Sequence, residues 1–206
     1  MAGDLAVKHV GALGWSNVAG GEALLVERCA AGDQDASAEL VAEHYRMVLS
    51  LGTSLLGDRD EALDLAQDVF LRVFRTINRF RGQSALRTWI YRITVNQARN
   101  RQRWWRRRHH DDQVSLDEHL RCPGGVPLRS NVMAPDRIAA SRELADRLQA
   151  ALERLPFEQR AAIVLREIEG LSYEEIAFSL QLAIGTVKSR LTRARQALRA
   201  ELRAVR

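Results

Sequence analysis

Apolar side chains recur at steps of three and four residues along most of this chain, and residues that start or stop helices bound each run. One run follows Gly57, opens at Asp58 with an acidic first turn, and continues through Leu65, Val69 and Val73. Acidic residues favour a helix N-terminus, and this spacing places the apolar positions on one helical face. No stretch shows the alternation expected of a strand. The pattern therefore predicts an all-α fold.

The second half of the chain carries similar helix boundaries. Pro156 suits the first turn of a helix, and Gly170 ends the run that follows it. Ser172 and Glu175 have the spacing of a capping box, which predicts a short helix from this point. A tight turn over residues 181–183 separates that helix from a longer basic helix, which we expect to begin at about Gly185.

Composition divides the chain into two helical domains. Residues 1–20 are rich in Gly and Ala without a sustained period, which predicts a disordered tail. Residues 21–106 form the first predicted domain and residues 137–206 the second. Between them, residues 107–136 contain Pro123, Gly124, Gly125, Pro127 and Pro135, which predicts a flexible linker spanning about 30 Å on average.

The sequence argues against several classes of protein. Its 206 residues include no apolar run near the roughly 20 needed to cross a bilayer and no secretion signal, so we expect a cytoplasmic protein. Only Cys29 and Cys122 are present, which supports neither a disulfide framework nor a zinc site. His109 and His110 precede two aspartates, but they lie in the predicted linker without a scaffold. We expect no metal, no cofactor, no small-molecule substrate and no catalytic site.

The charge is strongly uneven, although the net charge is only +5. From Val69 to His110 there are 12 arginines and no acidic residue. An uncompensated basic tract of this kind is typical of a surface that binds a polyanion.

Aromatic residues interrupt the same tract, namely Phe80, Trp89, Tyr91, Trp104 and Trp105. Positive grooves with stacking rings bind single-stranded DNA, and a flipped base also needs polar groups that contact its edge. Gln83, Ser84 and Asn96 could supply those groups. A role in the core is the alternative for Phe80 and above all for Trp89, whereas Trp104 and Trp105 remain open between surface stacking and a membrane-like contact.

Two further surfaces are predicted. Acidic residues cluster between Asp58 and Asp68, and this cluster either forms a docking face for a protein partner or only favours a helix N-terminus. The second surface is a helix-turn-helix, whose second helix presents Lys188, Ser189, Thr192, Arg193 and Arg195 outward. An ordinary helical hairpin with a solvated basic face is the alternative.

These motifs resemble those of a known family. Residues 64–70 (DLAQDVF), 80–84 (FRGQS), 88–93 (TWIYRI) and 96–100 (NQARN) resemble region 2 of bacterial sigma factors. Residues 155–156, 166–177 (REIEGLSYEEIA) and 185–195 (GTVKSRLTRAR) resemble region 4. Both regions occur in order with a short linker and no region 3, so the chain resembles the extracytoplasmic-function (ECF) group over residues 36–106 and 137–202.

The resemblance implies a promoter-recognition subunit of RNA polymerase and assigns expected roles. The expected contacts to the β′ coiled coil of the polymerase core are Asp64, Leu65, Gln67, Asp68, Phe70, Leu71 and Arg72. Those to the −10 element are Phe80, Gln83, Ser84, Arg87, Trp89, Arg92, Asn96, Arg99, Asn100 and Arg103. Those to the −35 element are Ser172, Tyr173, Thr186, Lys188, Ser189, Arg190, Thr192 and Arg193. The remaining surface of region 4 would contact the polymerase β flap, and an anti-sigma factor, often membrane-bound, would regulate the protein.

Two functions of other classes remain open on the residues alone. A stand-alone helix-turn-helix regulator would act as a dimer on a palindromic site. An RNA-binding accessory protein would prefer RNA to forked DNA.

Overall fold

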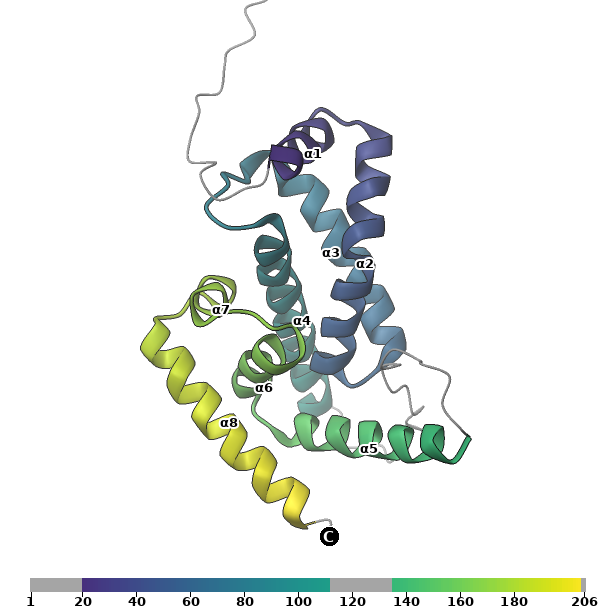
Figure 1. The fold of residues 1–206 in the computed structure, drawn as a ribbon, viewed down its shortest axis with the longest axis vertical. Coiled ribbons are helices and arrows are strands. Elements are labelled where there is room, and N and C mark those ends of the chain that lie inside the picture. Colours follow the sequence, from purple (N-terminus) through teal and green to yellow (C-terminus); the bar gives the residue numbers. More distant parts are fainter. Residues whose placement is uncertain (1–19, 112–134, 205–206) are drawn as a thin grey trace, which may run out of the picture.

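The computed structural model describes residues 20–111 and 135–204, and every regular element within those ranges is a helix (Figure 1). The first range contains α1 (Gly20–Ala30), α2 (Gln34–Leu56), α3 (Arg59–Thr76), the short 3-10 helix η1 (Ile77–Arg79) and α4 (Leu86–Asp111). The second contains α5 (Pro135–Arg154), α6 (Phe157–Ile163), the π-helical turn η2 (Val164–Ile168), α7 (Tyr173–Leu180) and α8 (Ile184–Ala204). The predicted all-α fold is confirmed. The predicted tail, apart from Gly20 in α1, lies outside the described residues.

The predicted helix boundaries are largely confirmed by local hydrogen bonds. Asp58 caps α3 by accepting a hydrogen bond from the Glu61 amide at 2.9 Å. Gly57 ends α2 with φ of 80°, a left-handed conformation that favours glycine. Ser172 and Glu175 form the capping box in full, because each side chain accepts from the backbone amide of the other residue.

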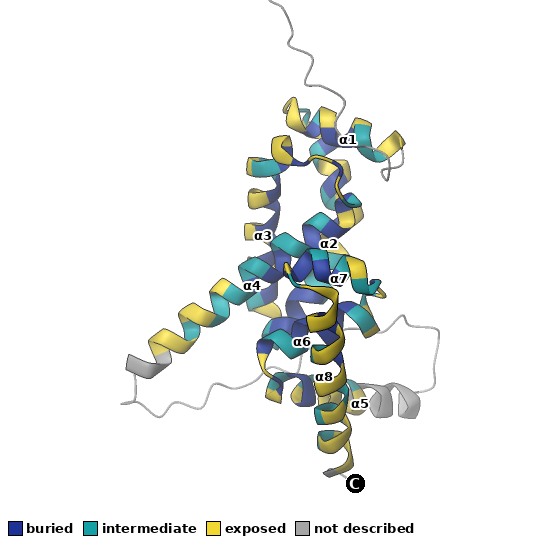
Figure 2. Cartoon of the chain, turned by 90° about the vertical axis from the view of Figure 1, so that its left-hand side faces the viewer, coloured by how far each residue is buried: buried dark blue, intermediate teal, exposed yellow. Residues whose placement is uncertain are grey.

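The core of the first half lies between α2, α3 and α4. Leu40, Val48, Leu65, Val69 and Ile90 are completely buried there. Figure 2 shows buried and exposed stretches alternating along α2 and α3. In α4, Val95 and Ala98 are also buried, while Trp89 and Ile93 pack partly against the core. This bundle holds the loop at residues 80–85 and the exposed face of α4 in fixed positions.

The two halves pack against each other and share one core. In Figure 1, α7 lies beside the middle of α4, and α5 crosses below the end of α2. The sequence predicts two helical domains joined by a flexible linker. In this structure the two domains are in contact, an arrangement that we call closed. A helical pattern cannot report such packing, because it identifies the apolar face of each helix but not its partner.

Arg160 of α6 is a buried polar link between the halves. Its guanidinium donates to the carbonyl oxygens of Leu55 at 2.7 Å, Glu153 at 2.6 Å and Leu155 at 3.2 Å. Leu55 belongs to the last turn of α2, where carbonyl groups lack helical partners and favour a cation. Burial lowers the pKa of Arg160, but the carbonyl cage matches the charged group.

One predicted boundary, the end of the first domain at residue 106, requires correction. Helix α4 continues to Asp111 rather than ending near Arg106, because residues 107–111 contain no Gly or Pro to stop it. Of the predicted linker, residues 112–134 lie outside the described residues. In α5, Leu144 is 65% exposed, since no described element covers that face of the helix.

Cys29 is buried in the core of the first half, and burial raises the pKa of its thiol. This environment disfavours the reactive thiolate. Cys122 lies outside the described residues. Among the described helices, none combines the length and apolar character required to cross a membrane.

Candidate nucleic-acid interface

A pocket of about 700 Å³ opens beside the loop that joins η1 to α4. Seven of the residues predicted to contact the −10 element line it, namely Phe80, Gln83, Ser84, Trp89, Arg92, Asn96 and Asn100. The rings of Phe80 and Trp89 meet at a centroid distance of 5.3 Å, and the first ring is almost fully buried. Phe80 therefore forms the wall of the pocket rather than a free stacking platform.

The pocket combines aromatic walls, amide groups and positive charge. Asn96 accepts a hydrogen bond through Oδ1 from Arg99 at 3.1 Å, which orients its amide. Arg72, Arg79 and Arg81 also line the pocket. Stacking surfaces, amides that contact base edges and arginines that contact phosphates are the features that single-stranded DNA requires. The three arginines were missed as pocket residues, although their place in the acid-free tract is visible in the sequence.

Arg87, Arg99 and Arg103 were predicted with this group but do not line the pocket. Arg103 is exposed further along α4. Arg87 donates to the Tyr91 hydroxyl at 2.7 Å, and Arg99 donates to Glu158 at 2.9 and 3.2 Å. In this conformation the latter two side chains are engaged by groups of the protein itself.

One arginine of α4 forms hydrogen bonds and ion pairs with the acidic face of α3. Arg101 donates to Glu61 at 2.7 Å and to Asp68 at 2.8 Å, and lies 4.0 Å from Asp64. Asp64 is nevertheless 72% exposed, and Gln67 and Leu71 are exposed on the same helix. This face remains available to a partner.

Two expectations for this docking face need correction. Leu65 and Phe70 are buried in the bundle core, so they support the face from inside and cannot contact a partner directly. Arg72 is exposed on α3 and also lines the pocket. Leu65 and Phe70 lie near Asp64 in sequence, but the turn of the helix directs their side chains toward the core.

Helix α8 presents the side chains predicted for duplex recognition. Thr186, Lys188, Ser189, Thr192 and Arg193 are exposed, whereas Val187, Leu191 and Ala194 are buried beneath them. Arg190 is different, because it donates to Glu158 at 2.6 Å. Ser172 is used as the cap of α7, and the ring of Tyr173 lies under the Arg166 guanidinium at 5.0 Å, so both are structural in this conformation.

Among the residues that the structure describes, no group of three or more His, Cys, Asp or Glu is arranged to bind a metal ion. The side chains of His109 and His110 lie outside that part of the chain.

Comparison with known families agrees with the geometry. The sequence matches Sigma-70 region 2 over residues 40–109 and Sigma-70 region 4 over residues 145–198. The first match covers α3, the pocket and most of α4, and the second covers the helix-turn-helix.

Characterised relatives match over most of their length. The chain is 38% identical over 174 residues to the RNA polymerase sigma-H factor of Pseudomonas aeruginosa, covering 84% of this chain and 90% of the relative. It is 39% identical over 175 residues to the ECF RNA polymerase sigma-E factor of Escherichia coli, covering 85% and 91% respectively.

Two solved structures share the fold. CnrH in complex with the cytosolic domain of CnrY matches with a TM-score of 0.64 at 27% identity, covering 89% of this chain and 97% of that one. RpoE of Bartonella quintana in complex with the anti-sigma factor NepR matches with a TM-score of 0.63 at 27% identity, covering 82% and 98%. Members of this family are in general not enzymes. The chain therefore belongs to the sigma-70 family, as an ECF sigma factor composed of regions 2 and 4.

Proposed function

We propose that this sigma factor binds RNA polymerase core and directs it to promoters by dividing recognition between its two regions. Region 2 captures a base of the separated −10 strand in the pocket beside Asn96, and region 4 contacts duplex DNA at the −35 element through α8. The observation that carries this proposal is the pocket itself, which combines aromatic walls, amides and arginines as strand capture requires. The chain supplies recognition, and the catalytic step belongs to the polymerase.

Core binding is assigned to the exposed acidic face of α3. Asp64, Gln67, Asp68 and Leu71 project there, and Arg101 orients the Asp68 carboxylate by a hydrogen bond of 2.8 Å. A basic helical partner such as the β′ coiled coil would complement this charge.

Region 4 offers a second contact for the polymerase. An apolar groove of about 330 Å³ lies between α5, η2 and α8, with Leu148, Leu152, Ile163, Leu198 and Leu202 among its lining residues. We assign this groove to an apolar helix of the β flap. An anti-sigma factor would regulate the chain, since two related solved structures are complexes with such a regulatory partner or its domain. The site of action would be the cytoplasm, where polymerase resides.

Dependence on core polymerase tests the proposal. The chain alone should shift a labelled fragment of its own upstream DNA weakly, and addition of core should give a discrete protected region covering both elements. Tight and specific binding of the free chain as a dimer would contradict the proposal and favour a stand-alone helix-turn-helix regulator.

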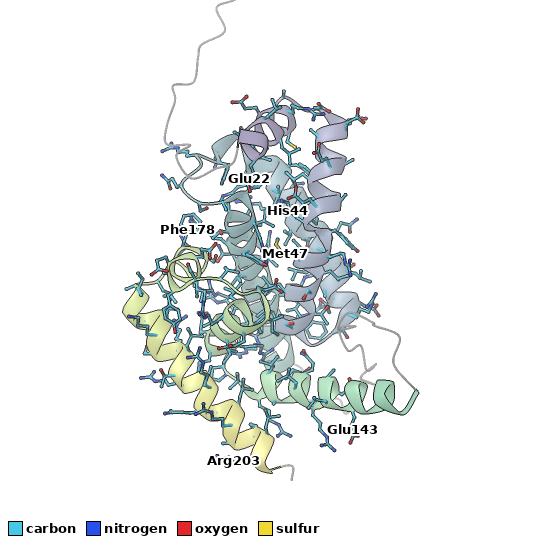
Figure 3. All side chains as sticks on the ribbon, in the orientation of Figure 1. Glu22, His44, Met47, Glu143, Phe178 and Arg203 are labelled. Atoms are coloured by element: carbon cyan, nitrogen blue, oxygen red, sulfur yellow. The ribbon has the colours of Figure 1, made fainter. Side chains whose placement is uncertain are left out.

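Arg193→Ala should weaken initiation that depends on the −35 element. Arg193 is exposed on α8, and loss of a bidentate contact to a base costs about 1–3 kcal/mol. Abortive initiation should be measured on templates with and without the −35 element. Arg203→Ala, at the far end of the same helix (Figure 3), is the matched control and should behave as the parent. An equal loss on both templates would contradict a role in −35 recognition.

Asn96→Ala should impair promoter opening but not duplex binding. The amide is oriented by Arg99 and lines the pocket, so its loss removes hydrogen bonds available only to an unpaired base and should slow opening about tenfold. Permanganate footprinting measures opening, and Gln102→Ala on the same helix is the control. A template already mismatched at −10 should restore the activity of Asn96→Ala, and an equal defect on that template would contradict the assignment.

A further inference from the structure

The packing of region 4 on region 2 covers part of the surface that the proposed function assigns to DNA. Helix α7 packs against the middle of α4 (Figure 1), and the contacts between them are specific. The Thr88 hydroxyl donates to Glu175 at 3.2 Å, and Ser179 donates to the carbonyl oxygen of Thr88 at 3.4 Å.

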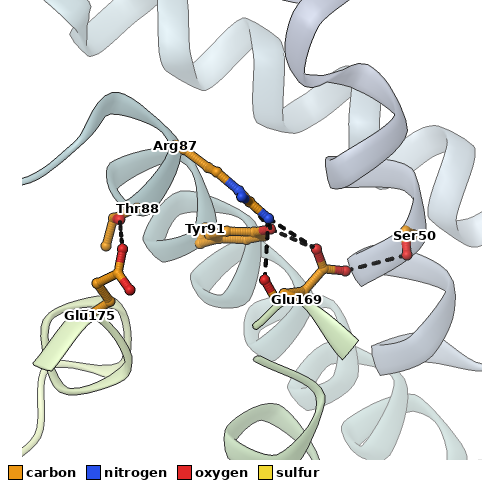
Figure 4. Close-up of polar contacts among 6 residues, drawn as sticks. All are labelled: Ser50, Arg87, Thr88, Tyr91, Glu169 and Glu175. Carbon is orange, nitrogen blue, oxygen red and sulfur yellow. Dashed lines mark hydrogen bonds and ion pairs between the residues drawn. The ribbon is translucent and has the colours of Figure 1, made fainter. Parts of the chain in front are cut away.

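A buried carboxylate of region 4 anchors this contact. Glu169 accepts hydrogen bonds from the hydroxyl of Tyr91 at 2.6 Å and from Ser50 at 3.3 Å, while Arg87 donates to its carbonyl oxygen at 3.2 Å (Figure 4). Its side chain is only 8% exposed. Tyr91 is fully buried, and burial together with the nearby Glu169 carboxylate raises the pKa of its hydroxyl, which therefore stays protonated as the donor.

A second carboxylate binds one arginine from each DNA-reading set. Glu158 accepts two hydrogen bonds from Arg99 of α4, at 2.9 and 3.2 Å, and one from Arg190 of α8, at 2.6 Å. Two oxygens that accept from a forked guanidinium reproduce the way a phosphate is bound. One side chain of region 4 thus occupies arginines that both regions would present to DNA.

An aromatic ring of region 4 reaches the pocket. Phe178 of α7 is among the residues that line it, and the Arg92 guanidinium lies 5.5 Å from the centre of the Phe178 ring (Figure 3). A stacked base would make a similar contact with an arginine. Because residues 69–110 contain no acidic residue, the carboxylates that α4 meets in these contacts come from Glu158, Glu169 and Glu175 of region 4.

We propose that region 4 acts as an internal mimic of promoter DNA on region 2, with carboxylates in place of phosphates and Phe178 in place of a base. This inference rests on the proposed function of the α4 surface. The free chain then keeps its −10 surface covered, and core polymerase exposes it by holding the two regions apart. Residues 112–134 connect α4 to α5, and a segment of that length can reach about 70–80 Å, which permits such a separation.

Competition with single-stranded DNA tests the mimicry in the full-length chain without polymerase. The probe is a fluorescein-labelled 20-nucleotide DNA of random sequence, and its fluorescence anisotropy gives the affinity. The double variant Glu158→Gln, Glu169→Gln should bind about tenfold more tightly than the parent, because the apparent affinity is reduced by the fraction of the chain that is competent to bind.

A matched control separates release of the surface from the change of net charge. The double variant Glu143→Gln, Glu201→Gln removes the same charge and also frees two arginines, since these carboxylates pair with Arg147 and Arg154 on exposed helix faces. It should bind the probe within about twofold of the parent. Equal affinity of the test and control variants would overturn the mimicry.

Circular dichroism at helical wavelengths shows whether the double variant folds. If it does not fold, a second variant provides the test. Phe178 is only half-buried, so Phe178→Ala should fold and should bind the probe about threefold more tightly. No gain in affinity would overturn the proposal. A parent that binds the probe as tightly as these variants, yet directs specific transcription with core, would contradict the mimicry alone. Absence of specific transcription in the parent would instead contradict the proposed function.

Discussion

Replacing Asp64 with arginine is expected to lower the affinity for RNA polymerase core by about 100-fold, because like charges brought together at an interface cost several kcal/mol. The position is suited to the test, since Asp64 is 72% exposed on α3 and its carboxylate lies 4.0 Å from the Arg101 guanidinium, at the limit of an ion pair. The substitution therefore changes the docking face with little effect on the bundle. Affinity can be measured by the competition of labelled chain and variant for core polymerase.

The matched control is Glu39→Arg, which makes the same charge change on α2. Glu39 is exposed and forms a loose ion pair with Arg28 at 3.6 Å. This variant should bind core within about threefold of the parent. The promoter sequences chosen by the residual Asp64→Arg complex should be unchanged. If both variants lose affinity equally, the docking face has been placed on the wrong helix.

Replacing Arg160 with alanine should destabilise the closed chain by about 3 kcal/mol, because three buried carbonyl groups lose a charged donor at once. These are the carbonyls of Leu55, Glu153 and Leu155, so the loss affects both the end of α2 and the junction of α5 with α6. For a chain of this size the expected fall in Tm is about 6–12 °C. Thermal unfolding followed by circular dichroism measures it.

Arg154→Ala provides the comparison for this variant. Arg154 is exposed and pairs with Glu201 on α8, a surface contact expected to contribute less than about 1 kcal/mol. A change in Tm for Arg160→Ala no larger than that for Arg154→Ala would show that the carbonyl cage contributes little to the closed arrangement.

Much of the fold follows from local sequence signals. Caps at Asp58 and Ser172, the stop at Gly57 and the apolar stripe of α3 all have the predicted roles. Each depends on hydrogen bonds or spacing within a few residues, which is the information that a single sequence carries. The packing of α7 on α4 depends on residues about 90 positions apart, such as Thr88 and Ser179, and no local pattern reports it.

In the candidate site, too, local sequence signals identified some residues and could not identify those that depend on long-range packing. Phe80, Trp89 and Asn96 were identified from the aromatic and basic tract, and the structure brings them to one pocket. Leu65 and Phe70 were assigned to the docking face because they adjoin Asp64 in sequence, but the helix turns them into the core. Phe178 was missed entirely, since it reaches the pocket from the other region.

Reconstituted transcription tests the central claim, the division of promoter recognition between the two regions. Core polymerase and this chain should produce a run-off transcript from one start site on the chain's own upstream DNA. Arg193→Ala should lose dependence on the −35 element, and Asn96→Ala should recover on a template mismatched at −10. Start sites that do not depend on the chain, or variants of the two regions with identical defects on every template, would contradict the account.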